Sequence, residues 1–235
     1  MLNHFTISRF RTADWVVIAA NLLPVYGVWF LGWSAVDVFI VYALETLIAG
    51  FVTVLKLGVL TLHRRTDTWH NGEATAQVSG LFFILFFVLH FGLFAAVQTS
   101  IFSQSANIAP AGSGVLHFFF NWYKYIHGDT AYMLAGFLIS YLARQFVPFI
   151  VTGEYRTISM TRVMFQPYGR IVIQQFTVII GSMFLSFGLG KIFILIFALA
   201  KIVFEVFFNL EDKINRVMEE VERKEAEKKN PPKSV

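Results

Sequence analysis

The sequence predicts an all-α protein: a polytopic transmembrane bundle of about six spans, with an outer interfacial helix and a cytosolic C-terminal helical extension. Two observations lead to this prediction. Hydrophobic residues fill 56% of the 235 positions and charged residues only 14%, whereas soluble domains carry roughly 25% charged residues. In addition, nearly every lysine and arginine lies on one predicted side of the long apolar stretches.

Six apolar runs are long enough to cross a bilayer, whose hydrocarbon core of ~30 Å needs about 20 residues at ~1.5 Å per residue. In chain order the predicted spans are Trp15–Gly32, Val36–Leu62, Gly80–Phe102, Thr130–Val151, Ile171–Phe187 and Ile192–Asn209. The first run contains Pro24, and the fifth is short. We expect one transmembrane domain over residues 1–210, followed by a charged cytosolic helix and tail over residues 211–235.

The cations set the orientation, because the cytoplasmic connections of membrane proteins are enriched in lysine and arginine. With the N-terminus inside, the inner connections hold most cations, among them Arg64, Arg65 and Arg162, and the outer connections hold only Lys124 and Lys191. We expect both termini to be cytoplasmic and the membrane to be a bacterial inner membrane. The net charge of +4 follows from this topology and requires no nucleic-acid partner.

Three of the segments outside the predicted spans have a pattern of their own. Val115–Ile126 is too short to span but rich in aromatic rings, which predicts an interfacial helix on the outer leaflet. Gly153–Arg170 is expected to be a cytoplasmic connection. In Glu211–Lys229, acids precede cations by four residues, an order that stabilises an exposed helix. We interpret it first as a solvated continuation of the last span. The alternative is that its thin apolar stripe contacts a second copy of the chain, a membrane-complex partner or lipid headgroups; the lipid bilayer is the other expected partner.

Ionisable side chains inside a membrane are costly, so they face the bundle interior and pair. By residue count from the ends of their spans, Glu45 and His90 both lie near the middle of the membrane. We expect them to meet if the second and third spans are neighbours. Lys201 and Glu205 lie four residues apart on one helix face, where they can neutralise each other. Gly181 is expected to let another helix come close. The predicted polar cavity or helix-packing cluster comprises Glu45, His90, Gln98, Gln175, Lys201 and Glu205.

Glu45 and His90 are suitable as metal ligands or proton-relay groups, and equally as an interhelical hydrogen bond that fixes packing. Two ligands do not make a tight site, so we expect neither a metal nor another cofactor. His63, Asp67 and His70 also offer ligands, in a segment expected to be a solvated loop. The chain has no cysteine, no His-Glu-x-x-His motif, no glycine-rich phosphate loop and no nucleotide fingerprint.

Four short motifs give the chain a family resemblance. They are Asn21-x-x-Pro24, Tyr42-x-x-Glu45, His90-x-Gly92-x-Phe94 and Pro167-Tyr168-x-Arg170-Ile171-Val172. In this order they resemble an uncharacterised bacterial family of multi-span membrane proteins, a domain of unknown function, over roughly residues 15–209. The resemblance implies histidine in relatives at positions 98 and 175, asparagine at 46 and aspartate at 205. A ligand set in relatives would therefore be incomplete here, because glutamine is a poor transition-metal ligand.

Three functions remain open from the sequence. The first is a non-catalytic structural or accessory membrane subunit with a buried polar cluster, and it is the one that we favour. The second is a small-solute or proton transporter, or a channel-like protein, that uses a cavity at Glu45 and His90. The third is an intramembrane metalloprotein with Glu45 and His90 among its ligands. We do not expect an enzyme, since no complete catalytic set is present.

Overall fold

The computed structural model describes residues 12–71, 74–105, 108–110, 112–114, 116–169, 171–172, 180–181, 183–184, 186–203, 220 and 223. Helices dominate, as predicted. The long helices are α1 (Thr12–Phe30), α2 (Ala35–Arg64), α3 (Gly80–Ser105), α5 (Gly128–Tyr141) and α9 (Gly190–Ile202). Shorter helical segments are α4 (His117–Asn121), η1 (Trp122–Tyr125), η2 (Leu142–Phe146), α6 (Val147–Val151), η3 (Glu154–Arg156) and α7 (Met160–Phe165).

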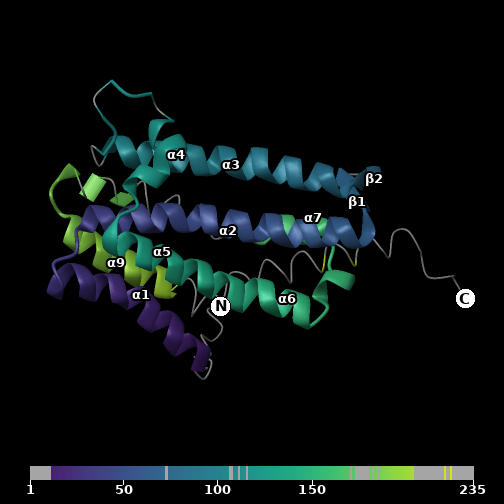
Figure 1. The fold of residues 1–235 in the computed structure, drawn as a ribbon, viewed down its shortest axis with the longest axis horizontal. Helices are drawn as coiled ribbons and strands as arrows, with labels where there is room; N and C mark the ends of the chain where they lie inside the picture. The colour runs from purple at the N-terminus through teal and green to yellow at the C-terminus, as the bar shows by residue number, and fades with distance from the viewer. Residues whose placement is uncertain are drawn as a thin grey trace, which may run out of the picture.

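Three of the described helical stretches are long and apolar enough to cross a membrane: Ala35–Arg64, Gly80–Gln104 and Gly128–Val151. They correspond to the predicted second, third and fourth spans and lie side by side in Figure 1. The first predicted span forms α1, and the described part of the sixth is α9. The fifth span and the charged C-terminal helix lie largely outside the described residues.

Helix α2 is the central element of the bundle. Its apolar window is 72% buried, against 33% for α3 and 17% for the α5–α6 stretch. One side of α2 packs against α3, another against α5, and α1 packs mainly against α9 (Figure 1). At Gly181 a side chain would begin 2.1 Å from the ring of Phe193 and 2.4 Å from that of Phe39. Only glycine fits there, in agreement with the expected close helix approach.

The α5–α6 stretch contains one loosened turn, η2, which is a π-helix. Pro148 lies at the start of α6, where it offers no backbone N–H and its ring crowds the preceding turn. The wider turn accommodates the proline, since the N–H of Val147 bonds to the carbonyl of Leu142 five residues earlier. The stretch ends at Gly153, whose φ of 74° suits glycine.

Two features differ from the expectations. The expected solvated loop after α2 is an antiparallel hairpin of β1 (Thr66–Asn71) and β2 (Ala74–Ser79). The expected cytoplasmic connection Gly153–Arg170 contributes to the core, because α7 packs against α2 and α3 near the hairpin end of the bundle (Figure 1). Three α7 side chains are fully buried there, namely Met160, Val163 and Met164.

Candidate functional site

A buried ion pair joins the central helix to the last described one. The Nζ of Lys201 on α9 donates to Oε2 of Glu45 on α2 over 2.9 Å. The hydroxyl of Tyr141, at the end of α5, donates to the other carboxylate oxygen over 3.1 Å. The Lys201 and Glu45 side chains are only 9% and 3% exposed. Three helices that are far apart in the sequence therefore meet at one carboxylate.

Aromatic rings surround the ammonium group of Lys201. Its Nζ lies 5.0 Å from the ring centre of Tyr42 and 5.8 Å from those of Phe137 and Phe197. Each distance is within the range in which a ring face attracts a cation. The edge of one ring meets the face of the other in the Tyr42–Phe197 pair, which has a centroid separation of 4.4 Å. The site is thus an ion pair inside an aromatic cage.

His90 has a different partner. Its Nδ1 lies 2.7 Å from the hydroxyl of Tyr168, and its ring packs between those of Phe86 and Phe94, one turn away on either side. Tyr168 precedes the predicted fifth span, and burial raises the pKa of its phenol to about 12. The phenol is therefore neutral at physiological pH and can donate its proton to the imidazole.

The packing of α2 on α3 explains why Glu45 and His90 do not meet. A side chain at Gly50 would begin 2.7 Å from the ring of Phe91, so these two positions face each other. In this antiparallel register His90 lies opposite Phe51, six positions beyond Glu45, or ~9 Å along the helix axis at ~1.5 Å per residue. The expectation that Glu45 and His90 form a pair is wrong, because counting from the ends of the spans did not fix the register.

Gln98 is buried with only 1% of its surface exposed. Neither its amide nitrogen nor its carbonyl oxygen has a hydrogen-bond partner in the part of the chain that the structure describes. The α2–α3 register places Gln98 opposite Ala43, at nearly the same level of the bundle as Glu45. Gln175 and Glu205, the other two predicted members of the cluster, lie outside the described residues. The expected pairing of Lys201 with Glu205 therefore also lies outside them.

Two hydrogen-bond partners and one buried cation were not predicted from the sequence. Tyr141 bonds to Glu45 and Tyr168 bonds to His90. Tyr168 lies in one of the four family motifs, whereas Tyr141 has no signal of its own in the sequence. Lys56 is buried, donates to Gln166 over 3.4 Å and lies 5.5 Å from a phenylalanine ring centre. Its position eleven residues after Glu45 puts it on the same face of α2, three turns on, which was the available signal.

The polar residues that follow α2 form a structural junction. Asp67 pairs with Arg64 over 3.2 Å and accepts the backbone N–H of Met160 over 2.7 Å, at the start of α7. The Arg64 guanidinium also donates to the carbonyl of Ile158. Asp67 thus satisfies one backbone N–H at the start of α7, whose N-cap is Ser159, and fixes the hairpin to the bundle, so it does not lie in a free loop. Of the expected loop ligands, His63 packs edge-on against a tyrosine ring, and the side chain of His70 lies outside the described part.

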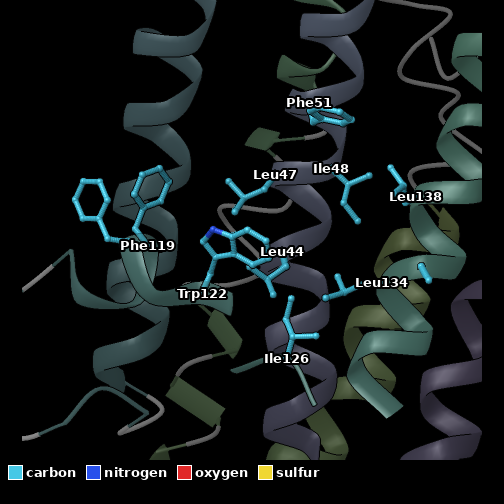
Figure 2. A pocket seen from close by; sticks show the side chains of 11 residues that line it. Leu44, Leu47, Ile48, Phe51, Phe119, Trp122, Ile126, Leu134 and Leu138 are labelled. Carbon is cyan, nitrogen blue, oxygen red and sulfur yellow. The ribbon is translucent and has the colours of Figure 1, made fainter. Parts of the chain in front are cut away.

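An apolar groove lies among α2, α5 and the α4–η1 segment (Figure 2). Its volume is about 640 Å³. Leu44, Leu47, Ile48 and Phe51 form one stripe of α2 along it, and the ring system of Trp122 projects from η1. The groove is separate from the ion pair, because neither Glu45 nor Lys201 lines it.

A family model, described as a family of unknown function (DUF6498), matches residues 5–232. The chain belongs to this family. Membership confirms the expectation of an uncharacterised family, and it brings no activity with it. No curated protein and no solved structure matches the chain.

In this DUF6498 member the described residues include no group of three histidine, aspartate or glutamate side chains that could hold a metal ion. Glu45 is already engaged by an ammonium and a phenol, and His90 by a phenol. The arrangement around Glu45 can hold three helices together or store one charge pair away from water.

Proposed function

We propose that the chain is a six-span protein of a bacterial inner membrane, with both termini cytoplasmic, that serves as a non-catalytic structural or accessory subunit. The observation that carries this proposal is the closed Glu45–Lys201 pair. A carboxylate and an ammonium that neutralise each other inside an aromatic cage suit a tie between helices. A conducting or catalytic group instead requires access to water or substrate.

The partner-binding element in this proposal is the charged segment over residues 211–235. Its acid-before-cation order favours an exposed helix on the cytoplasmic side, available to a second copy of the chain or to another membrane subunit.

The test is purification of the full chain in a mild detergent, beside a version lacking residues 211–235. The expected result is a stoichiometric complex, or a dimer, that is lost with the segment while the thermal stability of the remaining bundle is unchanged. A homogeneous monomer for both versions would contradict the accessory role.

A second function, transport of protons or a small polar solute, is favoured by one observation. Gln98 is buried near the level of Glu45 with both polar atoms unsatisfied in the described structure, as is typical of a site that holds a water molecule or a polar solute. Vesicles that contain the protein and a pH-sensitive dye would test it. Proton flux that Glu45→Gln abolishes and Glu154→Gln, a change at an exposed position, leaves intact would replace the structural proposal by this one.

A further inference from the structure

The groove between α2 and α5 has a lining made of hydrocarbon. Leu44, Leu47 and Ile48 line it from α2, and Leu134 and Leu138 line it from α5. Phe119 and Trp122 line it from the α4–η1 segment (Figure 2). The indole nitrogen of Trp122 is the single polar side-chain atom among the lining residues. Water in such a groove would lose hydrogen bonds without replacement, so a polar solute does not fit it.

The walls of the groove belong to two of the three helical stretches long enough to cross a membrane. The medium next to the groove is then the acyl chains of the bilayer. The stripe from Leu44 to Phe51 covers about 10 Å at ~1.5 Å per residue, which fits within one leaflet of a hydrocarbon core of ~30 Å. This length suits a chain that enters from one side of the membrane.

A lysine suited to contact a lipid headgroup lies on the segment that lines one end of the groove. Lys124 belongs to η1, the short helix that also carries Trp122, and its side chain is exposed. Lys124 is the single lysine or arginine between Arg65 and Arg144 in the sequence. Exposed Tyr123 lies beside it, and aromatic rings and lysines of this kind contact lipid headgroups at membrane interfaces.

We propose that the groove binds one acyl chain of a phospholipid whose phosphate contacts Lys124. Bulk lipid is as apolar as the groove, so selectivity comes from the shape of the walls and from the charge of Lys124. The site goes beyond a structural role of the protein, and it rests on the proposed membrane placement.

The test uses the full chain in vesicles of phosphatidylethanolamine and phosphatidylglycerol that contain a phospholipid with a diazirine in the middle of one acyl chain. After photolysis, mass spectrometry maps the labelled peptides. Labelling should concentrate on residues 44–51 and 134–138. Lys124→Gln should lower it about fivefold, the factor for one lysine near an anionic surface, and Lys124→Arg should preserve it.

Variants that fill the groove with a bulky side chain provide a second part of the test. Ala135→Trp places an indole in the groove, and Leu47→Trp does so from the opposite wall, so that one variant suffices if the other misfolds. Gly136→Trp is the matched control, because Gly136 is exposed and a side chain there would meet nothing within 4 Å. The groove-filling variants should reduce labelling to the level of lipid-facing positions elsewhere, and the control should leave it unchanged.

The proposal would be overturned if the groove and exposed α3 side chains such as Leu89 were labelled to the same extent, and if Ala135→Trp did not change the labelling of the groove. Competition by free fatty acid but not by unlabelled phospholipid would overturn it as well. Failure of the membrane placement has a different signature, since the protein would then leave the vesicles in an alkaline carbonate wash.

Discussion

At the residue scale, Lys201 combines a salt bridge to Glu45 with ring faces of Tyr42, Phe137 and Phe197. The cost of burying an ammonium is offset by the carboxylate and, in smaller part, by the rings. Replacing both partners of such an ion pair with apolar residues changes the free energy of unfolding little, whereas removing one partner lowers it strongly.

We therefore expect Glu45→Gln and Lys201→Met each to lower the free energy of unfolding by about 3–5 kcal/mol, because each removes one partner of the buried Glu45–Lys201 pair. The double variant should lose much less than the sum of the two. Unfolding in detergent, followed by circular dichroism, measures the three values. Glu154→Gln, at an exposed position, is the control and should change the value by no more than about 0.5 kcal/mol. Additive losses in the double variant would mean that the two charges are not coupled.

A second residue-scale prediction separates His90 from Glu45. Tyr168→Phe removes the phenol that contacts the imidazole and should cost about 0.5–1.5 kcal/mol, with non-additivity in combination with His90→Gln. His90→Gln combined with Glu45→Gln should be additive within about 0.5 kcal/mol, since the residues lie well apart. Coupling between Glu45 and His90, measured by the same unfolding assay, would contradict the α2–α3 register described above.

The sequence identified Glu45, His90, Gln98 and Lys201 as polar residues within apolar spans, because an intramembrane charge is visible without any structure. It did not identify their partners. Pairing depends on the register of one helix against another, and that register follows from contacts such as Gly50 against Phe91, which no local pattern reveals. A two-residue slip in depth moves a side chain by ~3 Å and changes its partner.

At the scale of elements, α2 and α3 show how one small residue sets a helix contact. Gly50 lies against the ring of Phe91, whereas Gly58, two turns further along α2, faces open space. Alanine is the better helix former at both positions by up to about 1 kcal/mol. The two glycines therefore form an internal comparison between packing and helix propensity.

We expect Gly50→Ala to destabilise the protein by about 1–3 kcal/mol, because its Cβ would begin 2.7 Å from the Phe91 ring and the helices would have to separate. Gly58→Ala should be neutral or stabilising. The measurement is the thermal unfolding midpoint in detergent. If both substitutions stabilise the protein to the same extent, then α2 and α3 are not in close contact at Gly50.

The boundaries of the elements show which of them the local sequence pattern was sufficient to predict. Span two was predicted at Val36–Leu62 and is found at Ala35–Arg64, since hydropathy alone determines a membrane-length helix. The hairpin was missed although Gly72-Glu73, a glycine-first pair between Asn71 and Ala74, is a hairpin-turn signal. The burial of α7 had no local signal, because it depends on Asp67 and on the walls of α2 and α3.

At the scale of the whole molecule, the bundle has two distinct ends. The hairpin and α7 occupy one end, and α4 with η1 occupies the other (Figure 1). In the proposed topology the first end is cytoplasmic and carries the Arg64–Asp67 junction, whereas the second end faces outward and carries Lys124.

Single cysteines test this orientation without background, because the chain contains no cysteine. Thr66→Cys, in β1, should be shielded from an impermeant thiol reagent in intact cells, and Ser105→Cys, at the end of α3, should react. Permeabilised cells serve as the control, since both positions should then react. The reverse pattern in intact cells would mean that both termini lie outside.

The ion pair between Glu45 and Lys201 also has a consequence for the order of events during synthesis of the chain. The two residues lie 156 positions apart, so at ~5–20 residues per second α2 is made roughly 10–30 s before its counter-ion on α9 exists. Throughout that interval the Glu45 carboxylate of the nascent chain lacks its Lys201 partner, so the final arrangement of α2, α5 and α9 can form only when synthesis is nearly complete. A ribosome that stalls before α9 would release a chain whose Glu45 lacks the ammonium of Lys201, a difference by which membrane quality control can distinguish it from a finished molecule.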